Sequence, residues 1–315
     1  MVRLSVILPC HNEADNIPIC YSRLTDILSS TGKTYECIFV DDGNTDHTLT
    51  VIKDLCRRDS RIRYISFSRN FGHQKALRAG LNAARGRAAV TMDADLQHPV
   101  SVIPELLARW EEGYEIVNTR RTDAARTGLF KRLTSRLFYR TLNFLTGMNL
   151  QKGAADFRLT DRKVTDVLCR CPENDLFLRG MINWCGFRQT TVAYRAENRH
   201  AGQSRYTLSR MAALALDGIT SFTIRPLRLG VLLSGLFVLL GGAEIGYVCY
   251  VAFCTDRSVS GWASLAILIT VLGAATLLML GIIGEYVGRT FMQVKQRPPY
   301  IIRETNINDI NPPTP

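Results

Sequence analysis

The sequence predicts an α/β domain with a mostly parallel, Rossmann-like sheet, followed by two transmembrane helices. Two observations lead to this fold class. Short apolar segments typical of buried strands alternate with helical segments over residues 4–92, at the spacing of roughly 30 residues that is typical of strand–helix–strand units. Two long apolar segments then follow at residues 229–254 and 265–284, and they hold one charged residue between them.

The composition excludes a disordered or fibrous chain, because 46% of the 315 residues are hydrophobic and the pattern is aperiodic. The chain has 39 Lys+Arg against 28 Asp+Glu, a net charge of +11. A mean hydropathy of +0.01 averages two unlike parts, since residues 1–226 hold most of the charge and residues 227–288 very little. We therefore expect a domain at 1–226, a transmembrane region at 227–288 and a tail at 289–315.

The cysteines and the first ten residues predict that the N-terminal domain lies in the cytoplasm. Nine cysteines are scattered without a CxxC pair, which is typical of reduced thiols facing a cytosol. Residues 1–10 lack the long apolar core of a signal peptide. We therefore expect the chain to begin as a folded domain.

Taken in order, the first 92 residues predict four strands and three helices. The strands are short buried runs such as LSVIL and ECIFV, and Pro9 is expected to end the first of them. The strands are expected at residues 4–8, 36–40, 62–67 and 88–92, and the helices at about 12–29, 45–57 and 74–84.

Acidic side chains follow three of these strands. They are Glu13 after the first, Asp41 and Asp42 after the second, and Asp93 and Asp95 after the fourth. Ligands of parallel sheets bind just beyond the carboxyl ends of the strands, so three such loops favour a binding site, although one acidic pair alone is also common in surface turns. The sequence contains neither GxGxxG nor GxxxxGK[ST], which excludes the dinucleotide fingerprint and the P-loop.

Asp93 and Asp95 form a DxD pattern that predicts a divalent cation site. Two carboxylates on a tight turn offer hard oxygen ligands, which suit Mg²⁺ or Mn²⁺. Such a cation is usually shared with a diphosphate, whose charge must be offset as it leaves. Gln97 and His98 follow directly and either complete or line the site.

Each long apolar segment can cross a hydrocarbon core of roughly 30 Å; the alternative is a pair of buried core helices. Their outer flanks are basic, whereas the loop at 255–263 has one Arg against one Asp. The flanking cations are Arg225 and Arg228 before the first segment, and Arg289, Lys295 and Arg297 after the second. By the positive-inside rule, both flanks are expected in the cytoplasm and the loop outside.

A basic segment at residues 119–144 carries seven Lys and Arg residues against one Asp, with leucines at 129, 133 and 137. This pattern predicts an amphipathic helix at about 120–144 on an anionic membrane surface, and a second interface helix is expected at about 207–224. The alternative is a solvated cationic face. Basic patches also bind nucleic acid, but no recognition motif supports such a partner here.

Three segments resemble the signatures of inverting family 2 glycosyltransferases with a GT-A fold. They are Ile7–Glu13, Val40–Asp46 and Met92–Gln97. Further segments resemble the polyprenyl-phosphate glycosyltransferases, namely the bactoprenol glucosyltransferases and the dolichol-phosphate mannosyltransferases: they lie at residues 68–72, 155–159, 177–181, 199–206 and 284–289. The resemblance covers about residues 3–303, and it departs from the usual pattern at Asn44, usually Ser, and Arg205, usually Lys.

The resemblance implies an enzyme that moves a sugar from a nucleotide sugar to a membrane polyprenol phosphate. The expected pair is glucose from UDP-glucose and undecaprenyl phosphate, with mannose or an aminoarabinose derivative as alternative sugars. It also implies Mg²⁺ or Mn²⁺ as cofactor, contact with anionic lipid, and a multi-pass protein of the bacterial inner membrane with both termini cytoplasmic. A homo-oligomer is left open.

The resemblance also implies roles for single residues. The metal is expected on Asp95, with Asp93 on metal or ribose and Gln97 near the ion. Asp41 or Asp42 is expected to contact uracil. The remaining donor-side residues are Pro9, Asn12, Glu13 and Asn70.

The acceptor side is expected to involve Asp156 and several arginines. A general base is usually proposed at the position of Asp156, but an acceptor phosphate with a second pKa near 6 is mostly dianionic at pH 7 and hardly needs one. The general base therefore stays open, and the other roles expected for Asp156 are to orient the acceptor or the donor sugar, or to pair structurally with Arg158 or another arginine. Arg199, Arg205 and Arg179 are candidates to bind the acceptor phosphate, because guanidinium groups match its oxygens.

Two rival functions remain at this point. A non-catalytic membrane scaffold would keep the fold, but the intact Asp93, Asp95 and Asp156 argue against it. A processive polysaccharide synthase would carry more spans and a QxxRW motif. The sequence has two spans, and its one Arg–Trp pair, Arg109–Trp110, has Leu106 in place of the glutamine.

Overall fold

The structure is a computed structural model that describes residues 2–122, 154–174, 177–195, 220, 223–254 and 261–308. The chain divides into two compact units, residues 1–218 with 296–315 and residues 219–295. Most of the two expected interface helices, most of the loop at 255–263, and both Arg199 and Arg205 lie outside the described residues.

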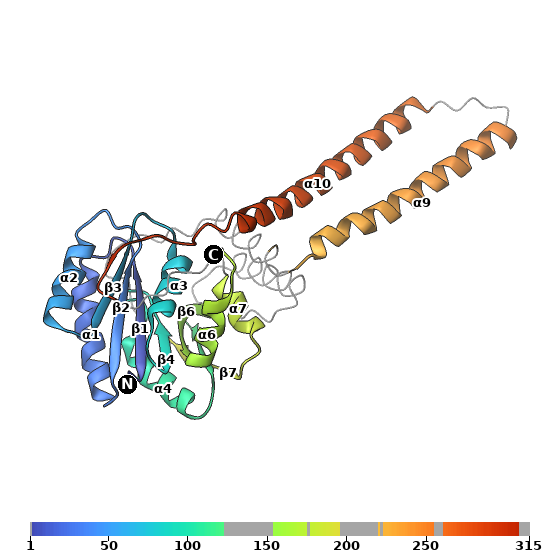
Figure 1. The fold of residues 1–315 in the computed structure, drawn as a ribbon. Helices are drawn as coiled ribbons and strands as arrows, with labels where there is room; N and C mark the ends of the chain where they lie inside the picture. The colour runs from blue at the N-terminus through green and yellow to red at the C-terminus, as the bar shows by residue number, and fades with distance from the viewer. Residues whose placement is uncertain are drawn as a thin grey trace. The chain divides into compact units, whose positions relative to one another are not determined.

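The first unit is built on an eight-stranded sheet with the order β7-β5-β6-β4-β1-β2-β3-β8 (Figure 1). Its strands are β1 Leu4–Cys10, β2 Tyr35–Asp41, β3 Ile62–Phe67, β4 Ala88–Thr91, β5 Ile116–Arg121, β6 Ala154–Asp161, β7 Gln189–Tyr194 and β8 Ile302–Thr305. Strands β1 to β4 pair in parallel, as do β5 and β7, whereas β6 and β8 run antiparallel to their neighbours. The predicted mostly parallel sheet is confirmed.

Helices fill the connections between these strands. They are α1 Asn16–Ser30, α2 Thr48–Arg58, α3 His73–Ala83, α4 Ile103–Glu111 after the short turn η1 Val100–Val102, α6 Arg162–Arg170 and α7 Leu178–Trp184. The strand and helix order expected over residues 4–92 is confirmed within a few residues. Helix α1 begins four residues late because Asn12 adopts a left-handed backbone (φ 59°) and so cannot start a helix.

Two expected boundaries are wrong. Strand β1 continues through Pro9, which pairs with Val40. Proline costs no hydrogen bond there, because β4 on the other side has already ended at Thr91. Arg120 and Arg121, expected to open the basic helix, end β5 instead, where β6 and β7 supply hydrogen-bonding partners on both sides.

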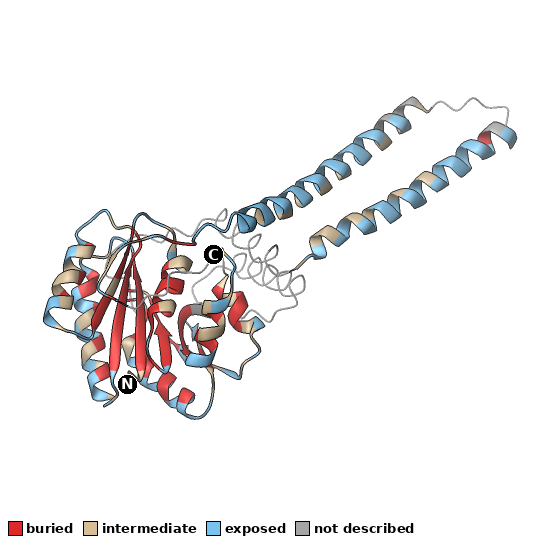
Figure 2. Ribbon diagram, in the orientation of Figure 1, coloured by how far each residue is buried: buried red, intermediate tan, exposed pale blue. Residues whose placement is uncertain are grey.

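The core lies on both faces of the sheet, and every residue of β1 and β2 is buried (Figure 2). Such double burial explains why these strands appear as continuous apolar runs in the sequence. One face packs against α1, α2 and α4, and the other against α3. Helix α3 crosses β1 closely at Gly80, where an added Cβ would lie 2.3 Å from Cγ2 of Ile7.

The C-terminal residues do not form the separate tail expected at 289–315. Strand β8 adds antiparallel to the edge strand β3, and the Tyr300 ring stacks on Phe67 with centroids 5.0 Å apart. The Asn306 side chain extends this pairing, since its Oδ1 accepts from the backbone N–H of Tyr64 at 2.8 Å. The end of the chain therefore belongs to the first unit.

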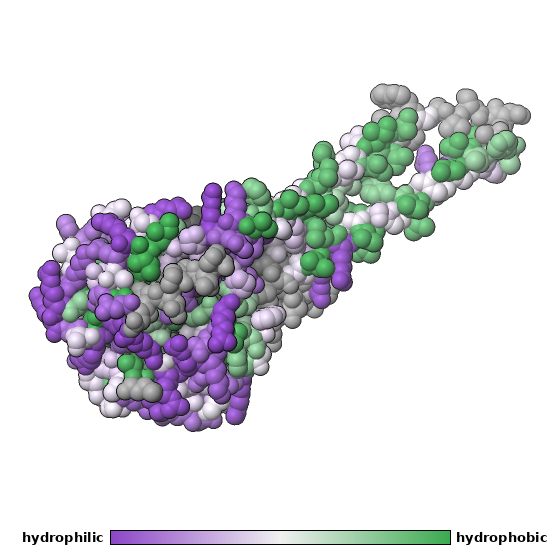
Figure 3. All heavy atoms as spheres, viewed as in Figure 1, coloured by the Kyte–Doolittle hydropathy of each residue, from purple (hydrophilic) through white to green (hydrophobic). Residues whose placement is uncertain are grey.

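The second unit consists of α9 Arg225–Cys254 and α10 Trp262–Val294. By length and composition, Arg225–Val251 and Leu268–Val294 are candidate membrane spans, with mean hydropathies of 1.9 and 2.0. Hydrophobic side chains cover much of both helices in Figure 3. At one point the helices touch, because a Cβ on Gly230 would lie 2.6 Å from the Met279 methyl group.

Candidate active site

The loops after β1 and β2 are joined by two reciprocal side-chain contacts. The backbone N–H of Asn12 donates to Oδ1 of Asn44 at 2.7 Å, and the N–H of Thr45 donates to Oδ1 of Asn12 at 3.0 Å. Next to them, the N–H of Glu13 donates to the Thr48 hydroxyl at 2.9 Å. The structure thus brings Asn12 and Glu13 to the loop after β2, and Asn44, the departure from the usual serine, supplies one of the acceptors.

Asp41 and Asp42 are almost wholly buried and hold neighbouring loops. Asp41 accepts from the Ser66 hydroxyl at 2.6 Å and from the N–H of Asn44 at 2.9 Å. Asp42 accepts from the N–H groups of Phe71 and Gly72 at 2.7 and 3.0 Å. Both carboxylates therefore shape the loops of the site, and a contact with uracil stays a prediction.

Gly43 lets the loop after β3 approach closely. Its φ of +64° lies in the left-handed region, and an added Cβ would lie 2.2 Å from the carbonyl carbon of Arg69. Asn70 follows in that loop, with its amide nitrogen 3.2 Å from Nδ1 of His11. The expected donor-side residue Asn70 is thus brought beside the loop after β1.

The DxD turn fits a divalent cation. Oδ1 of Asp93 is buried and accepts no hydrogen bond from the described residues, while Oδ1 of Asp95 accepts from the N–H of Gln97 at 3.1 Å. Within the described ranges, no group of three His, Cys, Asp or Glu side chains comes together as a complete metal site. A pair of carboxylates in which one oxygen accepts no hydrogen bond suits Mg²⁺ or Mn²⁺ that shares its other positions with a diphosphate.

Asp156 on β6 is the centre of a second polar cluster. Arg179 on α7 donates to both of its oxygens, with Nε to Oδ1 and Nη2 to Oδ2 each at 2.9 Å. Arg158 donates to Oδ1 at 3.0 Å and Gln74 to Oδ2 at 3.3 Å. Nε2 of His73 lies 3.7 Å from Oδ2 of Asp156 and 3.5 Å from Oδ1 of Asp93, so it stands between the two clusters.

The electrostatics of this cluster do not favour a general base. Burial alone would raise the pKa of Asp156, but His73, Arg179 and Arg158 outweigh burial and hold that pKa well below its usual range. A carboxylate that is held ionised by two guanidinium groups accepts a proton poorly at neutral pH. The geometry instead favours the alternative in which Asp156 pairs structurally with arginines.

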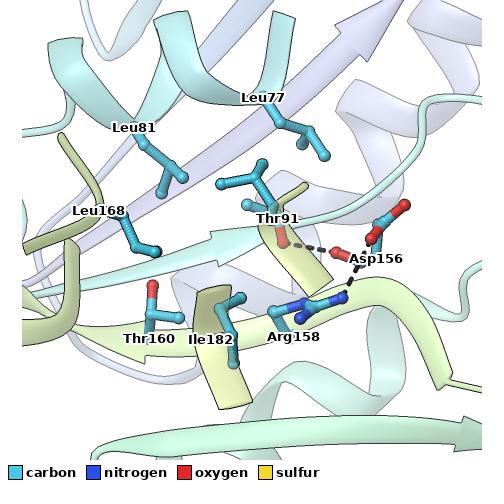
Figure 4. A pocket seen from close by; sticks show the side chains of 9 residues that line it. Leu77, Leu81, Thr91, Asp156, Arg158, Thr160, Leu168 and Ile182 are labelled. Carbon is cyan, nitrogen blue, oxygen red and sulfur yellow. Dashed lines mark hydrogen bonds and ion pairs between the residues drawn. The ribbon is translucent and has the colours of Figure 1, made fainter. Parts of the chain in front are cut away.

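A small cavity borders the cluster at Asp156 (Figure 4). Its lining is mostly aliphatic, with Leu77 and Leu81 from α3 and Ile182 from α7, and Asp156 and Arg158 form its polar end. Its volume of about 10 Å³ corresponds to roughly one water molecule. No substrate fits there, whereas the side chains of Arg179 and His73 on the same cluster are 26% and 41% exposed.

Comparison with known proteins decides the family. The model of glycosyl transferase family 2 matches residues 5–169. The uncharacterized glycosyltransferase YkcC of Bacillus subtilis (strain 168) is 40% identical over 96% of this chain and 94% of its own. The chain belongs to glycosyltransferase family 2. Membership confirms that the protein is a glycosyltransferase of the GT-A fold class that the three signatures predicted.

This glycosyltransferase is also similar to a second relative in sequence and to a solved structure. The SfII prophage-derived bactoprenol glucosyl transferase of Shigella flexneri is 35% identical over 97% of this chain and 99% of its own, so α9, α10 and β8 lie within the shared length. Among solved structures, glucosyl-3-phosphoglycerate synthase from Mycobacterium tuberculosis with Mn²⁺, UDP and phosphoglyceric acid has 22% identity and a TM-score of 0.47, covering 70% of this chain and 76% of its own.

Two residues of the glycosyltransferase site were not placed beside Asp156 from the sequence. They are His73 and Gln74, which both approach Asp156 from the first turn of α3. Their position directly after the Asn70–Phe71–Gly72 segment was the available signal, because α3 begins at the same edge of the sheet as the DxD turn. Arg179 was expected, but as a separate phosphate-binding residue rather than as a partner of Asp156.

Proposed function

We propose that this glycosyltransferase moves a sugar, glucose from UDP-glucose in the first instance, to the phosphate of undecaprenyl phosphate with inversion. Relatives of nearly the same length bear the name bactoprenol glucosyl transferase. The observation that carries the proposal is the position of His73 between Asp93 and Asp156. It joins a carboxylate pair suited to a metal-bound diphosphate to an arginine suited to a second phosphate.

In this mechanism an acceptor phosphate oxygen attacks the anomeric carbon of the sugar from the face opposite the diphosphate. A carbon–oxygen bond to the acceptor forms as the bond to the nucleoside diphosphate breaks. The acceptor is mostly dianionic at pH 7, since its second pKa is about 6, so no side chain has to remove a proton.

The residues of the chain bind and orient in this scheme. Asp156 holds the guanidinium of Arg179 through two hydrogen bonds, and Arg179 binds the acceptor phosphate. Arg199 and Arg205, which lie outside the described residues, are proposed to bind the same phosphate. Asp93 and Asp95, with Gln97 beside them, would hold Mg²⁺ or Mn²⁺, whose charge offsets that of the leaving diphosphate.

The same proposal places the protein in the bacterial inner membrane, with α9 and α10 as spans. Strand β8 follows α10 in the chain but pairs with β3, which supports an even number of crossings between the two parts of the sheet. With the basic flanks, this favours a cytoplasmic first unit and an outside loop at 255–263. A cysteine placed at Ser258, after removal of native thiols, should react with a reagent added outside; labelling only from the cytoplasmic side would contradict this topology.

Turnover by the purified protein tests the reaction. UDP-glucose and undecaprenyl phosphate with Mg²⁺ or Mn²⁺ should yield a glucose-linked lipid, and a panel of UDP- and GDP-sugars separates glucose from mannose or an aminoarabinose derivative. Asp95→Ala should abolish turnover without lowering the melting temperature, because the diphosphate loses its counter-charge. Full activity in EDTA would contradict the metal role, and no turnover with any sugar would favour the scaffold alternative.

Arg179 has its own test. Arg179→Ala should raise KM for undecaprenyl phosphate by about ten- to hundredfold, since a charge-assisted phosphate contact is worth roughly 1.5–3 kcal/mol, with little change in KM for the nucleotide sugar. A loss confined to donor binding would move Arg179 to the nucleotide side of the site.

A further inference from the structure

The ring of His98 lies directly beside the DxD turn and is fixed by two aromatic side chains. Its imidazole stacks on Phe157 of β6 with centroids 5.1 Å apart and an angle of 20°, and meets Tyr194 of β7 edge-on at 6.0 Å. Phe157 and Tyr194 also contact each other edge-on at 5.8 Å. His98 is 8% exposed, so its ring has little freedom to move.

The fixed ring makes one directed hydrogen bond to the turn. The backbone N–H of Asp93 donates to Nδ1 of His98 at 3.0 Å. A backbone N–H only donates, so Nδ1 carries no proton in this contact and the ring acts as an acceptor. Within the turn, Leu96 adopts a left-handed backbone (φ 63°) and Asp95 accepts from the N–H of Gln97. The hydrogen bond from Asp93 to His98 then links the first residue of the turn to the residue that follows Gln97.

Strand β6 connects this contact to the other half of the site. Successive side chains of a strand point to opposite faces of the sheet. Asp156 therefore lies in the cluster on the α3 face, whereas Phe157 points to the opposite face and stacks on His98 there. The backbone of Phe157 is held in turn, since its carbonyl accepts from the Thr119 hydroxyl at 2.7 Å. One strand therefore supports both the Asp156 cluster and the DxD turn.

We propose that His98 is a positioning residue that fixes the backbone of Asp93 and so sets the direction in which the two DxD carboxylates face a divalent cation. The proposal rests on the proposed role of Asp93 and Asp95 in holding that cation. His98 itself does not touch the cation or the substrates. Its contribution is the acceptor at Nδ1, and the aromatic rings serve to hold that acceptor in place.

Two substitutions separate the acceptor from the ring. His98→Phe keeps an aromatic ring between Phe157 and Tyr194 but removes the acceptor, whereas His98→Asn can place its amide oxygen near the position of Nδ1. Both are made in the full-length chain. Lys53→Met is the matched control, because Lys53 pairs with Glu304 on the surface and has no part in the site.

Two measurements then apply to every variant. The first is Mn²⁺ binding in the presence of UDP, followed by the electron paramagnetic resonance of free Mn²⁺. Loss of a residue that orients metal ligands typically weakens metal binding by about ten- to hundredfold, which is the loss expected for His98→Phe. The second is hydrogen exchange of the Asp93 amide, which should speed up several-fold in His98→Phe, because one net hydrogen bond of about 1 kcal/mol is lost.

The proposal requires that His98→Phe shows both effects at an unchanged melting temperature and that His98→Asn restores most of each. Wild-type Mn²⁺ affinity and wild-type Asp93 exchange in His98→Phe would overturn it. So would a failure of His98→Asn to restore either property, since the ring alone would then matter. If the wild-type protein bound neither Mn²⁺ nor UDP, the proposed function would fail instead, and the exchange measurement would still decide whether His98 holds Asp93.

Discussion

The two units of this glycosyltransferase differ in whether their apolar side chains are buried or exposed. In the first unit, every residue of β1 and β2 is buried, and buried charges have partners, such as Arg63 on Glu36. In α9 and α10 large apolar side chains are exposed; Leu239 is 73% exposed. Water stabilises the first arrangement through burial, whereas the second suits the proposed membrane, in which hydrocarbon replaces water. The comparison separates residues that fold the enzyme from residues of the candidate membrane spans.

The largest expected effect concerns the C-terminal residues, which follow the candidate membrane spans in the chain but belong to the first unit. A chain ended after Lys295 loses β8 and the Tyr300 ring that stacks on Phe67. The edge of β3 and a large apolar surface are then exposed. We expect loss of UDP binding and of the cooperative melting transition. Glu304→Gln, which removes only the surface pair with Lys53, should cost less than about 1 kcal/mol, and a truncated chain that bound UDP normally would place these residues outside the folding unit.

The next effect compares one carboxylate in each unit. Glu36 accepts from the Ser5 hydroxyl at 2.6 Å and from the N–H of Arg85 at 2.7 Å, and pairs with the buried Arg63. Glu36→Gln leaves the guanidinium buried without its counter-charge, which costs about 3–5 kcal/mol in the free energy of unfolding. Glu244→Gln in α9 should leave that free energy unchanged. Urea unfolding of the first unit, followed by tryptophan fluorescence, checks both, and equal losses would refute the distinction.

An aliphatic pair makes the same comparison for packing. Leu24 in α1 is fully buried, so Leu24→Ala should lower the free energy of unfolding by about 2–5 kcal/mol. Leu239→Ala in α9 should change it by less than about 0.5 kcal/mol, and should instead weaken retention in lipid vesicles. If both variants lowered the unfolding free energy alike, α9 would be part of the soluble core.

The first half of the fold could be predicted because its signals are local. Buried parallel strands appear as apolar runs, and each expected strand in residues 4–92 matches an observed one. Strand β8 could not be predicted in this way, since Ile302–Thr305 is short and its partner β3 lies far away in the sequence. Its pairing depends on two features of the folded sheet, the free edge of β3 and the Phe67 ring on which Tyr300 stacks.

The candidate site also has a part that the sequence predicts and a part that it does not. The sequence predicts that the acidic residues at the strand ends lie together, because parallel strands place their carboxyl ends at one edge of the sheet. The partners of Asp156 depend on which helices cover that face of β6: α3 brings Gln74 and α7 brings Arg179. The sequence left pairing with an arginine open as a role of Asp156, but only the packing of α7 shows that Arg179 joins Arg158 in that pairing.

The smallest expected effect is an absence of pH dependence from Asp156. The first unit keeps this buried carboxylate ionised with its own cations, so its pKa lies well below the usual range. The stabilisation from a depressed carboxyl pKa is complete above the unfolded value of about 3.9 and is lost only as pH falls through the folded value. Between about pH 5 and 9, neither the unfolding free energy nor kcat should show a limb from Asp156.

The matching variant makes this absence measurable. Asp156→Asn removes the negative charge and one of the two acceptors that hold Arg179, so kcat/KM for undecaprenyl phosphate should fall by about ten- to hundredfold, by the same factor at every pH from about 5 to 9. A limb near pH 6 that persists in both Asp156→Asn and His73→Gln belongs to the acceptor phosphate, whose second pKa is about 6. His73→Gln is needed as a control, because Asp156 raises the pKa of His73 against the opposing effect of burial. A limb that persists in His73→Gln but disappears in Asp156→Asn would show that Asp156 takes up a proton during turnover, and Asp156 would then act as a general base.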